Sequence, residues 1–111
     1  MMPTVSDALA AVRSTGLRVT TMVWPDGDVP PLPYAVLVPH ESRGQVAGDG
    51  ITYRVRRYDV ELYMREISFP LMQALEDALD AAGINASSDV AVDESGRVSI
   101  AYYSMTLSER I

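Results

Sequence analysis

The chain has 111 residues, a net charge of −6 and no cysteine, a size that fits one domain with one hydrophobic core. Without cysteine, disulfides, thiolate metal sites and cysteine nucleophiles are excluded. No apolar run is long enough to span a membrane. The N-terminal segment lacks the features of a secretory signal, so we expect a cytoplasmic origin. Every basic residue is an arginine, and the acidic excess disfavours nonspecific binding to nucleic-acid phosphates.

The first predicted element is a short helix. Thr4 and Asp7 have the spacing of a capping box, in which a hydroxyl and a carboxylate cap each other's backbone N–H groups. Gly16 is well placed to end the helix. Residues 18–23, RVTTMV, are rich in β-branched side chains and predict a strand. The apolar residues that share one helical face are Val5, Ala8, Leu9 and Val12.

A proline-rich loop, WPDGDVPPLPY at residues 24–34, holds four of the seven prolines and the only tryptophan. Two interpretations have equal weight. The loop is either a stiff connection whose Trp24 and Leu32 cover the sheet edge, or a preorganised contact surface that loses little entropy on binding. The candidate contact residues in the loop are Trp24, Pro25, Asp26 and Leu32.

The middle of the chain predicts two strands and a connection. Residues 34–38, YAVLV, indicate a buried central strand closed by Pro39. Residues 40–50 are polar and glycine-rich, which indicates a flexible loop or the arm of a long hairpin. Residues 51–63 form the longest strand candidate, but the apolar alternation slips by one residue at Arg56-Arg57. A β-bulge there would restore the register; alternatively, the first half extends past the sheet and contacts another subunit.

The last third predicts a helix and a hairpin. Ser68 is a suitable N-cap with Pro70 in the first turn, and Gly83 is suited to end the helix. Residues 89–93 and 98–107 then indicate strands joined by a turn at 94–97. The apolar stripe of the helix is Leu71, Leu75, Ala78, Leu79 and Ala82.

This order of elements predicts an α+β fold. We expect a single domain over residues 1–111, with an arm or loop at 40–57. Its core is a largely antiparallel, mixed sheet of about four to five strands with two helices packed on one face. The strand order stays open at this stage.

No residue pattern indicates catalysis. His40 is the only histidine and has no nucleophile elbow nearby, so an ordinary exposed histidine is expected. Glu76, Asp77 and Asp80 are expected to form the solvated face of the second helix. Phosphate-binding and EF-hand motifs are absent from the sequence. We therefore expect no catalytic, cofactor-binding or metal-binding residues and no enzyme activity.

One basic cluster lies in the predicted arm. Aromatic neighbours would suit nucleic-acid stacking, but the acidic surroundings favour ion pairs across strands or between subunits. The candidate interface residues of this cluster are Arg43, Arg54, Arg56 and Arg57.

Several short motifs in this order carry a family resemblance. They are the helix end Gly16-Leu17, the segment Trp24-Pro-Asp-Gly27, Pro30-Pro-Leu-Pro-Tyr34, the turn Gly48-Asp-Gly50, the strand end Val60-Glu-Leu-Tyr63 and the helix end Ala82-Gly-Ile84. With them the chain resembles, over nearly its whole length, the small tail-terminator, tail-completion or head–tail joining proteins of long-tailed bacteriophages and prophages. The segment Ile67-Ser-Phe-Pro70 departs from the polar, charged helix entry of that family.

The resemblance implies a structural virion protein without catalytic residues or cofactors. Such a protein assembles in the host cytoplasm, typically as a homo-hexameric ring, and terminates the tail tube at the head-proximal end. Its implied partners are copies of itself, the tail tube protein and the head-closure or connector protein. An acidic lumen would let DNA pass without specific binding, since like charges repel within a Debye length of about 8–10 Å.

Two alternatives to a tail terminator remain. One is a head-closure or adaptor protein of the phage neck. The other belongs to a different class: a monomeric, prophage-encoded protein-binding module that uses the Trp24 loop as its contact surface. Oligomeric mass distinguishes this class from a preformed ring.

Overall fold

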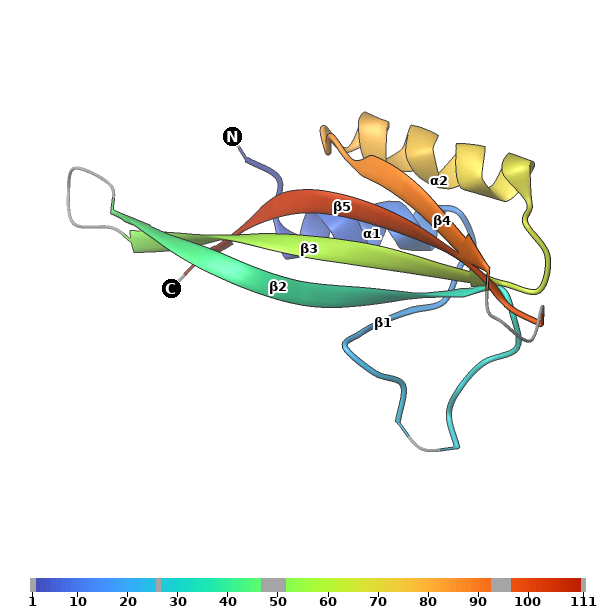
Figure 1. The fold of residues 1–111 in the computed structure, drawn as a ribbon. Helices are drawn as coiled ribbons and strands as arrows, with labels where there is room; N and C mark the ends of the chain where they lie inside the picture. The colour runs from blue at the N-terminus through green and yellow to red at the C-terminus, as the bar shows by residue number, and fades with distance from the viewer. Residues whose placement is uncertain (1, 26, 47–51, 93–96, 111) are drawn as a thin grey trace.

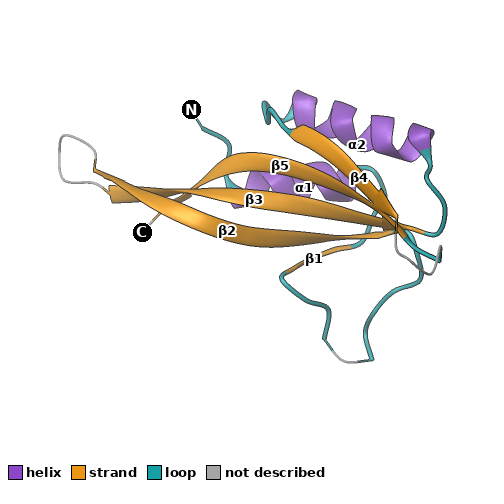
Figure 2. Ribbon diagram, in the orientation of Figure 1, coloured by secondary structure: helices purple, strands orange, loops and turns teal. Residues whose placement is uncertain are grey.

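Two helices lie on one face of a single five-stranded sheet (Figure 1, Figure 2). The structure is a computed structural model that describes residues 2–25, 27–46, 52–92 and 97–110. The α+β prediction, with both helices on one face, is confirmed. The elements in chain order are α1 (Val5–Ser14), β1 (Val19–Thr21), β2 (Tyr34–Val46), β3 (Thr52–Met64), α2 (Phe69–Ala81), β4 (Ser87–Val92) and β5 (Ser99–Arg110).

The strand order, which the sequence left open, is β1-β2-β3-β5-β4. Only β1 pairs in parallel with its neighbour, so the sheet is mixed but largely antiparallel. The central strand β3 pairs with β5 without interruption, from Tyr53 opposite Arg110 to Met64 opposite Ser99. The predicted bulge at Arg56-Arg57 is therefore wrong.

The irregularity lies in β2 instead. Between the pairs Pro39–Tyr58 and Ser42–Arg56, β2 advances by three residues while β3 advances by two. This β-bulge adds one residue to β2. The expectation that Pro39 closes the strand is also wrong, because β2 continues to Val46. A proline has no N–H for the ladder, and a position beside a bulge tolerates that loss.

Beyond the bulge, β2 and β3 form a long hairpin arm that projects past the helices (Figure 1). Of the two interpretations of residues 40–50, the hairpin arm is confirmed for the described part; residues 47–51 lie outside the described residues. The arm gives the molecule extents of 51 × 30 × 23 Å. The apolar alternation of β3 changes there because no helix covers the arm, and not because the strand slips.

Local chemistry sets the ends of both helices. Thr4 Oγ1 accepts a hydrogen bond from Asp7 N (3.2 Å) and Asp7 Oδ2 accepts one from Thr4 N (2.9 Å), which confirms the capping box. Ser68 Oγ accepts from Leu71 N (3.3 Å) at the start of α2. The helices end before Gly16 and Gly83, whose φ angles of 89° and 75° suit glycine. Neither described helix is long and apolar enough to cross a bilayer.

The core fills the layer between the sheet and the helices. Tyr103 of β5 is completely buried, and its hydroxyl donates to Glu76 Oε2 (3.2 Å). Burial, followed by the charge of Glu76, raises the pKa of Tyr103. Glu76 is half-buried, so the expected solvated face of α2 is wrong at this residue. Among the largest fully buried side chains are Val12, Leu37, Leu62, Met64, Leu75, Leu79 and Leu107.

The outer edge of β5 has two different neighbours. β4 pairs with this edge from Ser99 to Ser104, and farther along β5 the backbone N–H of Ser108 donates to Pro3 O (2.9 Å). At the outer edge of β4, Val90 N donates to the side chain of Asp89 (2.9 Å) and not to another strand. β4 begins two residues before the predicted strand, and the predicted turn at 94–97 lies largely outside the described residues.

We expect Leu75→Ala to lower the free energy of unfolding by about 2–5 kcal/mol, because it leaves a cavity where α2 meets the sheet. Gln73→Ala, on the exposed side of the same helix, is the matched control and should change stability by less than about 0.5 kcal/mol. Urea unfolding followed by circular dichroism measures both. Equal losses in the two variants would contradict this description of the core.

Candidate interaction surfaces

The sheet face opposite the helices is partly covered by the loop between β1 and β2. Alternation along a strand places Ala35 and Leu37 toward the helices and Tyr34 and Val36 on the opposite, open face. Val36 is nevertheless only 6% exposed. We conclude that the loop between β1 and β2 covers part of the open face. In Figure 1 this loop lies on the opposite side of the sheet from α2.

A strained turn directs the chain into this loop. Met22 has a φ of 72°, and Val23 N donates to Thr21 O (3.0 Å) across it, as in a γ-turn. A non-glycine residue in this region costs on the order of 1–3 kcal/mol and persists where its surroundings hold it. Here the bond from Met22 N to Leu37 O (2.8 Å) holds it. The turn leaves Met22 and Val23 65% and 74% exposed.

Three aromatic rings meet under the loop. Trp24 lies edge-to-face on Tyr34, with ring centroids 5.9 Å apart. Tyr34 stacks on Tyr63 of β3 at 5.1 Å. Trp24 Nε1 is buried and meets no acceptor among the described residues. The rings line a pocket of about 220 Å³, the Trp24 pocket, whose residues are Met22, Val23, Trp24, Val29, Tyr34, Val36, Glu61 and Tyr63.

Glu61 adds a carboxylate to the Trp24 pocket. Tyr63 Oη donates to Glu61 Oε1 (2.7 Å), and burial together with this bond raises the pKa of Tyr63. The tyrosine therefore stays a proton donor and Glu61 the acceptor. Sequence reasoning missed both residues. The available signal was their alternation with the apolar residues Val60 and Leu62, which places them on the face opposite the core.

The loop residues predicted as contacts have different surroundings. Trp24 lines the Trp24 pocket, Leu32 is half-buried and Pro25 is exposed. Asp26 lies outside the described residues. The structure joins features of both interpretations of the loop, because Trp24 packs on the sheet while Val29 stays 57% exposed beside it.

The arm arginines also differ from one another. Arg56 Nε pairs with Glu109 Oε1 across to β5 (2.7 Å), and Arg56 Nη1 donates to His40 O (2.8 Å). The expected cross-strand ion pairing is thus confirmed for Arg56. Arg54 lies opposite Glu109 in the ladder and helps to lower its pKa. Arg57 is exposed and has no hydrogen-bond or ion-pair partner in the described part of the chain. Of Arg43 the structure describes only its place in β2.

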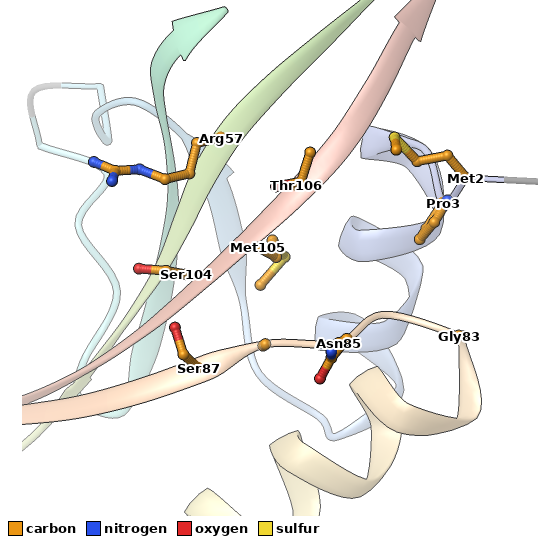
Figure 3. Close-up of a pocket in the computed structure, with 10 residues that line it drawn as sticks. Met2, Pro3, Arg57, Gly83, Asn85, Ser87, Ser104, Met105 and Thr106 are labelled. Atoms are coloured by element: carbon orange, nitrogen blue, oxygen red, sulfur yellow. The ribbon is translucent and has the colours of Figure 1, made fainter.

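Arg57 borders a second, open pocket beside β5 (Figure 3). Along β5, the pocket lies between Ser104, where the pairing with β4 stops, and Ser108, which bonds to Pro3. Arg57, Ser87 and Ser104 project on one side of the strands, away from the helices (Figure 3). The volume is about 750 Å³, and the lining is Met2, Pro3, Arg57, Gly83, Asn85, Ala86, Ser87, Ser104, Met105 and Thr106.

His40 belongs to a side-chain network that differs from a hydrolase triad. Asp59 bonds His40 Nε2 through Oδ2 (2.8 Å) and accepts from Ser104 Oγ through Oδ1 (2.7 Å). The carboxylate lies between the other two, whereas nucleophile activation needs the imidazole in that place. Among the described residues, no three histidine or carboxylate side chains gather as metal ligands. The half-buried, bonded His40 differs from the exposed histidine that was expected.

We expect acid to remove the contribution of Glu109 to stability. Its hydrogen bond from Tyr58 and its contacts with Arg56 lower the pKa of Glu109, while burial, followed by the same bond, raises the pKa of Tyr58 to about 12. A carboxyl with a lowered folded pKa stabilises the protein above its unfolded value of about 4.3 and loses this effect as pH falls through the folded pKa.

The stability difference between wild type and Glu109→Gln should therefore shrink between pH 7 and pH 3, measured by urea unfolding at each pH. Glu66→Gln, which removes an exposed carboxylate without a described bond, is the control. A difference that is independent of pH would contradict this role of Glu109.

Comparisons with known proteins identify a fold. No protein-family profile and no curated protein sequence matches the chain. Among solved structures, a chain of the "Virion of native gene transfer agent (GTA) particle" matches with a TM-score of 0.60 and 14% sequence identity. The match covers 94% of this chain and 84% of that one. At this identity, the likeness shows a shared fold across nearly the whole of both chains.

Proposed function

We propose that this protein is a structural component of a phage-like virion. In this proposal it forms a ring at the head-proximal end of the tail, where it terminates the tail tube and joins it to the head. The observation that carries the proposal is the fold shared with a chain of a gene transfer agent virion over 94% of this chain. The motifs of tail-terminator proteins in the sequence support the same role.

Two unlike exposed surfaces support ring formation. A cyclic ring beyond a dimer needs heterologous contacts, in which one surface of a subunit meets a different surface of its neighbour. The surface around the Trp24 pocket is apolar, since Met22, Val23 and Val29 are exposed there. Arg57, in the predicted arm, is exposed and borders the open pocket beside β5. A third exposed apolar site is Phe69, 74% exposed, in the segment where the sequence departs from the tail-terminator family.

The charge of the chain suits a conduit for DNA. A ring of subunits that each carry −6 presents a large excess of negative charge. Like charge around a lumen repels phosphate, so DNA would pass without being held. Because this role needs no catalytic residues, we also propose that the protein has no enzyme activity.

Light scattering after size exclusion tests the ring. We expect a mass near six times the 12.1 kDa of one chain, and we expect Val23→Asp to lower it because a charge would replace exposed apolar surface at the contact. A strict monomer at all concentrations would favour the monomeric protein-binding module. Electron microscopy of particles that lack the protein then decides: unjoined heads or tails of uncontrolled length support the virion role, and normal particles contradict it.

The arm is tested separately through Arg57. We expect Arg57→Glu to reduce the oligomer fraction at least about tenfold, because reversing a charge at an interface replaces attraction by repulsion. Arg13→Glu on α1, in the helix layer, is the matched charge control. Arg56 is unsuitable for this test, because its replacement would break the ion pair with Glu109. Equal oligomer fractions in the Arg57 and Arg13 variants would show that the arm is not part of the contact between subunits.

A further inference from the structure

We propose that the Trp24 pocket binds the guanidinium group of an arginine side chain presented by a neighbouring protein chain in the particle. This inference rests on the proposed function and specifies the chemistry of one contact. Four features of the pocket carry it: its size, its aromatic walls, its carboxylate and its unpaired donor.

The volume selects the kind of occupant. At about 220 Å³, the Trp24 pocket is smaller than the clefts of about 300–1,000 Å³ that enclose small-molecule ligands and cofactors. It has room for one side chain that enters from a partner surface. The exposed Met22, Val23 and Val29 around the opening provide apolar contact for the partner's backbone and the methylenes of that side chain.

The walls select a planar cation. The rings of Trp24, Tyr34 and Tyr63, which contact one another, line the pocket. Aromatic faces attract cations, and guanidinium stacks on them better than the compact, strongly hydrated ammonium of lysine. Glu61 supplies the matching negative charge at the same place, with one oxygen oriented by the hydroxyl of Tyr63. An apolar ligand would offer no donor to the other carboxylate oxygen of Glu61.

The fourth feature is the indole N–H of Trp24. A buried donor without an acceptor costs about 1–3 kcal/mol, and Trp24 Nε1 is the one buried side-chain polar atom in the described residues that lacks a partner. A backbone carbonyl of the segment that carries the arginine would satisfy it once the indole turns toward the opening of the pocket. The pocket therefore offers one acceptor for the guanidinium and one donor for the partner's main chain. The strained turn at Met22, next to the pocket, is consistent with a binding function.

The test uses Trp24 as its own reporter, because it is the only tryptophan in the chain. The full chain is held at a dilution at which light scattering gives the monomer mass. It is titrated with N-acetyl-arginine amide, and with N-acetyl-citrulline amide as the neutral isostere. The readouts are the indole N–H resonance and the fluorescence of Trp24. Glu61→Gln removes the charge, and Glu66→Gln is the matched control outside the pocket.

We expect a saturable shift of the indole resonance with the arginine probe and none with citrulline. Glu61→Gln should weaken binding about tenfold, since a charge-assisted contact is lost, while Glu66→Gln should leave it unchanged. An equal response to citrulline, or no saturable shift at all, would overturn the inference. A ring that forms although the probe does not bind would refute this inference alone; a chain that binds the probe but never assembles would refute the proposed function alone.

Discussion

The fold depends on the central strand β3, which is hydrogen-bonded along its length to β2 on one side and β5 on the other. Because this ladder has no slip against β5, it fixes which residues meet across the sheet. It brings Arg56 near Glu109, Asp59 beside Ser104 and Tyr63 opposite Tyr34. The two candidate surfaces are therefore consequences of the two pairing registers of β3, one with β2 and one with β5.

The helices cover only part of one face of this sheet, and that asymmetry explains the rest of the molecule. Where α1 and α2 lie, β3 and β5 bury apolar side chains such as Leu62 and Leu107. On the arm, the same side of β3 carries Arg54 and Arg56, and the ion pair between Arg56 and Glu109 holds it instead. On the open face, the loop that bears Trp24 provides cover. The uncovered parts of the sheet are accordingly the parts that are available to partners.

The sequence was informative where structure is decided by neighbours in the chain. Thr4 with Asp7, Ser68 with Pro70, and the two helix-ending glycines predicted both helices, because capping needs only residues a turn apart. For the face change in β3, the predicted bulge is wrong because an alternation pattern reports what covers a strand, and not how it pairs. The other explanation, a contact with another subunit, stays a prediction. The bulge escaped notice because Pro39 and the polar residues after it carry no alternation to interrupt.

The residues of the Trp24 pocket also divide into those that local sequence could identify and those that it could not. Trp24 and Tyr34 are close in sequence, so the loop could be identified as a contact candidate. Glu61 and Tyr63 reach it only through the pairing of β2 with β3, which no local pattern specifies. Arg56 was assigned to the correct kind of interaction, but its partner lies 53 residues away on β5.

The bond between Asp89 and Val90 bears on how such a subunit assembles. A free sheet edge is a template on which identical chains can pair, and such pairing gives open filaments where the rotation between subunits does not close. At the outer edge of β4, the carboxylate of Asp89 already occupies the N–H of Val90 and places negative charge there. A second copy that approached by edge pairing would have to displace that bond and bring its own carboxylate close. In the ring that we propose, Asp89 would therefore disfavour contacts through this edge and leave them to the side-chain surfaces of the subunit.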